Sequence, residues 1–406
     1  MKADRKGSVT VFASVFFVSL LILLLAFIQA SRDRAAVSGG KALGSLWTDA
    51  VLAEYDINLF ERYGIFGFYG MQNDVEARLN HYAEYSFGKK KYISTDGFTA
   101  DLSGYALTDT SVFRKQVNKA GTKAIAESFI GPYVGGKPGD ESDADENHNA
   151  VLRNGKVADY LPSSGNDRAV TASAIASLLR GKTSASDFVK AGAEGYLQNR
   201  YINAYFKNGN DSKGLGSTFF ENEMEYIICA NLSDSGNLNG VRNRIIGIRE
   251  ALNMIYLNSD PEKNAAVTAA AAAIAPGPAA ILVKQGIFAA WAFAESINDY
   301  RLLMADRKVP LMKDDASWAT DLESILNNTE EGMIDPGSTR GDTYEDYLNV
   351  MIFAMDEEVR LLRMMDLIQI NMRFLYYDDF LLKTYNAGLR CNVEINGKRL
   401  EFTGEY

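Results

Sequence analysis

The residues of this chain best suited to catalysis are acidic residues that lie close together in sequence. Glu221, Glu223 and Glu225 alternate along one segment, and Asp314 and Asp315 are adjacent. Glycoside hydrolysis uses two carboxyl groups that face each other across a cleft. One hypothesis is therefore a membrane-tethered hydrolase that cleaves cell-wall or surface polymers with paired carboxylates. Acidic neighbours in sequence are more often solvated, so we prefer a non-enzymatic function.

Other catalytic and metal-binding residues are scarce. The 406 residues include two histidines, His81 and His148, and two cysteines, Cys229 and Cys391. A structural zinc site or a histidine-based triad would need nearly all of them. We therefore predict no catalytic residues, no cofactor-binding residues and no metal site.

One segment has the alternate acidic spacing of a calcium loop. Asp143, Asp145 and Asn147 match that spacing, but His148 replaces the glycine of the turn and Asn154 replaces the bidentate glutamate. The surrounding residues 131–155 are rich in glycine, proline and acids. This composition predicts a mobile loop that binds no calcium.

The overall charge argues against nucleic acid as a partner. The chain has 42 basic and 52 acidic side chains, a formal charge of −10 and a pI near 5.0. Proteins that bind nucleic acids neutralise phosphates with clustered basic residues. With 47% hydrophobic residues, the chain is also apolar enough to fold around a core.

The start of the chain has the composition of a membrane anchor. Residues 8–28 contain no charged side chain, and as a helix they would span roughly 30 Å, the thickness of a bilayer's hydrocarbon core. We predict a transmembrane helix at residues 8–30 in a single-pass protein of the cell membrane. A cleaved signal peptide is the alternative. The residues expected to face lipid include Val9, Phe12, Phe16, Leu20, Leu24 and Ile28.

The basic residues before this segment indicate its orientation. Lys2, Arg5 and Lys6 precede it, and the positive-inside rule places such residues in the cytoplasm. Residues 1–7 should then form a cytoplasmic tail, with the C-terminal domain outside. On that oxidising side, Cys229 and Cys391 could form a disulfide; two free buried thiols are the alternative, and the sequence leaves both open.

Residues 31–70 are predicted to continue the anchor as an amphipathic helix. Gly39 and Gly40 form a plausible weak point within it. The apolar face, which we expect to pack on the domain outside, consists of Leu43, Trp47, Val51, Tyr55 and Leu59, spaced four residues apart.

Residues 71–406 are predicted to form a helix-rich extracytoplasmic domain. Residues 265–294 should form a helical hairpin that bends at residues 276–278 (Pro-Gly-Pro), with a second membrane span as the alternative. Thr343 and Asp346 resemble a capping box at the start of one long helix that ends near Leu375. Further helices are expected at residues 71–87, 112–130, 189–206, 219–230 and 241–257.

The C-terminus has the clearest strand signal. Asn396 and Gly397 separate two alternating runs, which predicts a β-hairpin over residues 391–402. We expect it to pair with a strand-like region at residues 98–107. The predicted fold class is therefore α+β and mainly α-helical, with an N-terminal transmembrane helix, a helical ectodomain and a small antiparallel β-sheet.

Short motifs spread along the chain carry a resemblance to a family. They are Gly7–Phe12, Leu52–Asp56, Leu59–Phe66, Glu225–Ile228, Arg249–Asn253, Trp291–Ser296, Lys308–Leu311, Tyr344–Leu348 and Met364–Gln369. Together they resemble an uncharacterised bacterial membrane-protein family whose members commonly accompany tight-adherence (Tad, or Flp) pilus systems in Gram-positive bacteria. The resemblance implies a membrane and pilus context.

The N-terminus also resembles the pseudopilin-like (TadE/TadG-like) proteins of those systems. In these proteins a prepilin peptidase cuts after a glycine that precedes the apolar run, and Gly7 and Ser8 fit that position. Phe12 stands where the fifth mature residue is usually glutamate. The resemblance implies an accessory or minor pilin-like component whose partners are the lipid bilayer and pilus or assembly-platform proteins. It implies no particular oligomeric state.

Overall fold

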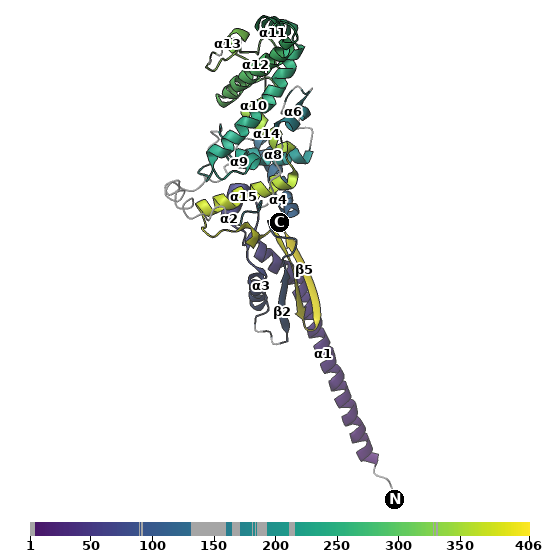
Figure 1. Ribbon diagram of the computed structural model, residues 1–406. Coiled ribbons are helices and arrows are strands. Elements are labelled where there is room, and N and C mark those ends of the chain that lie inside the picture. The colour runs from purple at the N-terminus through teal and green to yellow at the C-terminus, as the bar shows by residue number, and fades with distance from the viewer. Residues whose placement is uncertain are drawn as a thin grey trace. The chain divides into compact units, whose positions relative to one another are not determined.

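The computed structural model describes residues 5–88, 90, 92–130, 160–164, 171–180, 182, 184, 193–210, 216–327, 329 and 332–406 (Figure 1). The loop predicted near residues 131–155, including the calcium-like segment, lies outside them. The chain divides into two compact units. Unit 1 contains Met1–Phe60, Phe66–Val112 and Lys383–Tyr406, and unit 2 contains Glu61–Ile65 and Phe113–Leu382. Unit 1 thus crosses the predicted boundary at residue 70.

Unit 1 is built around one long helix and a three-stranded antiparallel sheet. Helix α1 (Arg5–Leu52) packs against strands β4 (Gly388–Ile395) and β5 (Lys398–Glu405), and β2 (Thr95–Asp101) pairs with β4 (Figure 1). The predicted hairpin and its partner strand are therefore confirmed. The remaining elements are α2 (Ile57–Tyr63), whose last residues belong to unit 2, β1 (Phe68–Tyr69), α3 (Gln72–Phe87) and β3 (Tyr385–Asn386).

The partner strand ends earlier than predicted. The carboxylate of Asp101 accepts hydrogen bonds from the backbone N–H of Ser103 at 2.9 Å and from its hydroxyl at 2.5 Å. Gly104 follows with a φ of 78°. This turn replaces the strand that the alternating pattern predicted as far as Leu107.

Helix α1 is continuous through Gly39 and Gly40, where the sequence predicts a weak point. The backbone of Gly40 lies so close to the hairpin that a Cβ there would overlap the side chain of Ile395. A Cβ on Gly44 would likewise overlap the ring of Phe402. These two glycines allow close packing between α1 and the sheet.

The amphipathic face packs on unit 1 as predicted, but the helix does not reach residue 70. Trp47 and Val51 are buried in the core with Phe98 and Leu389. The helix ends at Leu52, and Asp56 starts α2 by accepting a hydrogen bond from the N–H of Leu59 at 3.0 Å.

Unit 2 is mainly helical. A buried ion network joins two of its helices, because Arg249 contacts Asp299 at 2.8 Å and Lys313 contacts Glu295 at 2.5 Å. Its helices include α4 (Thr110–Ile130, beginning in unit 1), α6 (Ala172–Leu179), α8 (Ala193–Tyr205), α9 (Glu223–Cys229), α10 (Asp234–Ser259), α11 (Pro261–Ile274), α12 (Ala279–Met304), α13 (Leu322–Leu326), α14 (Tyr344–Ala354) and α15 (Glu357–Leu375).

The predicted helical hairpin is confirmed as α11 and α12. Helix α12 is long and apolar enough to cross a membrane by composition. Its Phe288, Trp291 and Ala292 nevertheless pack into a core cluster of unit 2.

The long helix predicted from Thr343 is two helices. The capping box between Thr343 and Asp346 is present at the start of α14. The chain leaves the helix at Met355, and the carboxylate of Asp356 accepts hydrogen bonds from the N–H groups of Glu358 and Val359. A second N-cap thus begins α15. The methionines of α15 are buried, which fits core packing.

Candidate functional site: the pocket beside the first helix

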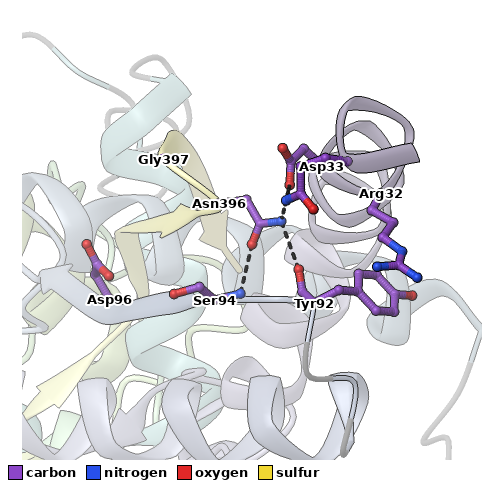
Figure 2. Close-up of a pocket in the computed structure, with 8 residues that line it drawn as sticks. Arg32, Asp33, Tyr92, Ser94, Asp96, Asn396 and Gly397 are labelled. Carbon is purple, nitrogen blue, oxygen red and sulfur yellow. Dashed lines mark hydrogen bonds between the residues drawn. The ribbon is translucent and has the colours of Figure 1, made fainter. Parts of the chain in front are cut away.

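A polar pocket of about 770 Å³ lies in unit 1 beside α1. Three segments form it: one turn of α1, the chain that leads into β2, and the turn between β4 and β5 (Figure 2). Its lining residues are Gln29, Arg32, Asp33, Tyr92, Ser94, Asp96, Asn396 and Gly397. Segments more than 300 residues apart in sequence therefore meet at one site.

The β4–β5 turn has the geometry that its sequence favours. Asn396 has a φ of 46° and Gly397 a φ of 74°. Positive φ at both central residues is the requirement of a type I′ turn, and Asn-Gly is the residue pair that adopts it most readily. The turn consequently presents the side chain of Asn396 to its neighbours.

Asn396 fixes the three segments to one another. Its Nδ2 donates to the carboxylate of Asp33 at 2.9 Å and to the carbonyl of Tyr92 at 3.0 Å. Its Oδ1 accepts from the N–H of Ser94 at 2.8 Å (Figure 2). Both the nitrogen and the oxygen of the Asn396 amide therefore have hydrogen-bond partners. The β4–β5 turn is attached to α1 at the position of Asp33.

The charged groups of the pocket differ in how they are paired. The Oδ1 of Asp33 accepts from Asn396 and, at 3.2 Å, from the Nε2 of Gln29. Within the described part of the chain, the side chains of Arg32 and Asp96 form no hydrogen bond or ion pair, and both residues are exposed. The lining thus contains one guanidinium and two carboxylates.

The pocket lies where the packing of α1 changes. Every residue of α1 from Val9 to Arg32 is exposed, Asp33 is half-buried and Ala36 is buried. The exposed stretch includes the uncharged run that ends at Ile28. Helix α1 is long and apolar enough there to cross a membrane. All six predicted anchor residues belong to it: Val9, Phe12, Phe16, Leu20, Leu24 and Ile28.

The backbone of Gly7 and Ser8, the predicted peptidase site, is helical. The side chain of Ser8 lies outside the described part of the structure.

The glutamates proposed for hydrolysis have structural partners. Glu223 and Glu225 are buried on α9, where Glu223 accepts from the N–H of Lys207 and Glu225 from that of Gly209, each at 2.8 Å. Burial raises the pKa of both carboxyls, that of Glu223 to about 7. Glu221 is exposed and contacts the ammonium of Lys207 at 3.3 Å.

The two adjacent aspartates point to different partners. Asp314 accepts from the N–H of Ser317 at 2.9 Å, whereas Asp315 accepts from the ammonium of Lys263 at 2.5 Å. Neither the α1 pocket nor a second pocket of about 390 Å³ along α12 is lined by any of these five acids.

Both cysteines are free thiols in the structure, Cys391 buried in unit 1 and Cys229 half-buried in unit 2. Cys391 is buried in the core of unit 1, and burial raises its pKa to about 12. Cys229 accepts a hydrogen bond from Arg244 at 2.9 Å, and burial raises its pKa too. Among the described residues, no group of three His, Cys, Asp or Glu side chains could hold a metal ion.

Sequence reasoning did not predict the α1 pocket. Asn396 and Gly397 were predicted only as a turn, and no role was predicted for Arg32 or Asp33. The signal present in the sequence was the position of these charges directly beyond residue 30. Nothing in the sequence indicated that the hairpin turn would reach them.

Residues 146–397 match a family of unknown function, DUF5702, over more than half of the chain. The chain belongs to this family. The DUF5702 region includes helices α6 to α15, strands β3 and β4, and the Asn396–Gly397 turn, whereas α1, β2 and β5 lie outside it. No curated protein and no solved structure matches the chain.

Proposed function

We propose that this protein is a single-pass membrane protein whose chain beyond the anchor at residues 8–30 lies outside the cytoplasm, and that it serves as an accessory or minor pilin-like component of a tight-adherence pilus system. The observation that carries the membrane part is the exposed stretch of α1 from Val9 to Arg32, which is apolar as far as Ile28. Such a surface is stable in lipid and not in water. Lys2, Arg5 and Lys6 favour a cytoplasmic N-terminus.

The pilus part rests on the motifs that resemble the pilus-associated family and on the glycine before the apolar run. In this function α1 associates with the helices of pilus or assembly subunits within the bilayer, by packing and not by catalysis. The folded part of the chain beyond the anchor then holds or orients those subunits. Helix α1 runs without a break from the exposed apolar stretch into the core of unit 1. This continuity supports mechanical coupling between the membrane segment and the folded core.

The membrane part is tested by mass analysis of the N-terminus of protein purified from membranes, in cells with and without the prepilin peptidase. A terminus at Ser8 that requires the peptidase and is blocked by Gly7→Leu identifies a processed pseudopilin. An intact terminus identifies a permanent anchor. A terminus beyond Ser31 would show a cleaved signal peptide and refute the anchor.

The pilus part is tested by photo-crosslinking from Phe16 in cells that assemble a tight-adherence pilus. A crosslink to a pilin or to an assembly-platform protein is the expected result. Tyr85, which is exposed on α3, serves as a control position outside the membrane. Absence of crosslinks to any pilus protein, together with normal piliation after deletion of the gene, would exclude this role.

A further inference from the structure

We infer that the α1 pocket binds the headgroup of an amine-bearing phospholipid, with phosphoethanolamine as the simplest example. The inference rests on the proposed membrane anchor, because the anchor sets the depth of the pocket. It adds a ligand and a defined site to that proposal.

The position of the pocket along α1 is the first argument. The bare stretch from Val9 to Arg32 corresponds to roughly 35 Å of helix, slightly more than a hydrocarbon core. Arg32 and Asp33 at its end therefore lie at the depth of the phosphate groups. Because Asn396 ties the β4–β5 turn to Asp33, the turn and the pocket wall lie at that depth as well.

The charged groups of the pocket are the second argument. Arg32 has no protein partner among the described residues, and a guanidinium binds a phosphate through two parallel hydrogen bonds. Tyr92 and Ser94 also line the pocket, and each has a hydroxyl that can donate to a phosphate oxygen. In Figure 2, Arg32 and Tyr92 lie on the α1 side, and Asp96 lies on the opposite side beyond the turn.

The carboxylates decide which headgroup is favoured. With Asp33 and Asp96 against one arginine, the lining carries a net negative charge. A purely anionic headgroup is therefore disfavoured, while a headgroup with both a phosphate and an ammonium matches both signs. An ammonium with N–H donors also suits Asp33, whose second carboxylate oxygen accepts no hydrogen bond from a described residue. A quaternary amine has no such donors.

The test uses the full-length protein in nanodiscs that contain equal amounts of phosphatidylethanolamine, phosphatidylcholine and phosphatidylglycerol with identical acyl chains. Native mass spectrometry measures which lipids stay bound when the protein is released. We expect phosphatidylethanolamine to be retained about tenfold over phosphatidylcholine, the size of one or two charge-assisted hydrogen bonds. Equal retention of the two, or preferential retention of phosphatidylglycerol, would overturn the inference.

Two variants at the same depth separate a pocket from general surface charge. Arg32→Gln should abolish the retention, whereas Arg34→Gln should leave it unchanged, because Arg34 is also exposed but does not line the pocket. Equal losses in both variants would show that the arginines only attract the membrane surface. The double variant Asp33→Asn and Asp96→Asn should bind phosphatidylethanolamine and phosphatidylcholine equally; an unchanged preference would contradict ammonium recognition.

Two further measurements distinguish a failure of the proposed anchor from a failure of the proposed headgroup site, and a lipid ligand from a soluble one. Resistance of the wild-type protein to carbonate extraction shows that α1 is embedded, so loss of lipid preference in an embedded protein refutes the headgroup site alone. Soluble glycerophosphoethanolamine at micromolar concentration should displace no lipid. Displacement would assign the pocket to a soluble ligand and refute the lipid assignment.

Discussion

At the scale of single residues, the buried acids of unit 2 are placed to hold backbone segments. Asp366 on α15 accepts from the N–H of Ser163 at 2.9 Å and from the hydroxyl of Tyr226 at 3.0 Å. Glu223 and Glu225 hold Lys207 and Gly209 in the same way. The sequence identified the last two acids but not their role, because alternation along a helix does not reveal burial by segments far away in sequence.

Asp366 should make unit 2 less stable as the pH rises. Burial raises its pKa to about 6, above the ordinary value near 3.9 of an unfolded chain. The folded state therefore keeps its proton between these values, and stability falls as the pH rises through 6, by at most about 3 kcal/mol. Asp366→Asn should remove this fall, since Asn accepts from Ser163 and donates to the hydroxyl of Tyr226.

The measurement is thermal unfolding of the full chain at pH 4.5 and pH 7.5. The wild-type protein should lose more thermal stability between the two than Asp366→Asn does. Glu223, whose pKa is raised to about 7, also lowers the stability as the pH rises, and it does so in both proteins. Identical pH dependence in the two proteins would mean that Asp366 is ionised in the fold at both pH values.

At the scale of elements, local signals predicted most boundaries. The Thr343–Asp346 capping box, the Asn396–Gly397 turn and the Pro-Gly-Pro bend all act within a few residues, so sequence alone located them. The break between α14 and α15 was missed because Asp356 was read as part of an apolar helix and not as an N-cap. The continuity of α1 through Gly40 was missed because its packing partner, Ile395, lies more than 350 residues away.

Two glycines of α1 should respond oppositely to the same substitution. No atom lies within 4 Å of a Cβ placed on Gly39, so Gly39→Ala should stabilise unit 1 by up to about 1 kcal/mol. Gly44→Ala should destabilise it, because the new Cβ would overlap the ring of Phe402. Urea denaturation compares the two, with fluorescence of Trp47 measured in a chain that carries Trp291→Phe and Trp318→Phe. A stabilising Gly44→Ala would show that α1 and β5 pack less closely than described.

At the scale of the molecule, unit 1 is assembled from both ends of the chain. We expect a chain that ends at Leu382 to lose the fold of unit 1, since it lacks β4 and β5 and exposes Trp47 and Phe98. Limited proteolysis of membranes should then cleave within residues 31–112. The full-length chain is the control. Protection of that region in the truncated chain would show that α1, α3 and β2 form a stable unit without the C-terminal strands.

The α1 pocket also belongs to this scale, and its composition explains why the sequence did not predict it. Three segments supply its residues, and only the register of β4 on β2 and the hydrogen bond from Asn396 to Asp33 bring them together. A sequence pattern describes each segment separately. The predicted anchor, the hairpin and the strand were each visible, whereas the site they form required their relative positions.

Closure of unit 1 by the last strands also imposes an order of events during synthesis. The face of α1 that contains Trp47 emerges about 340 residues before Leu389, its partner in the core. At ribosomal rates this interval is roughly 20 to 70 s. In the proposed membrane protein, the apolar part of α1 can already be in the bilayer throughout that time, while the adjoining face of the helix stays uncovered. Chains that stall before the end would therefore display an unfolded segment next to the bilayer, where quality-control proteases could distinguish them from finished molecules.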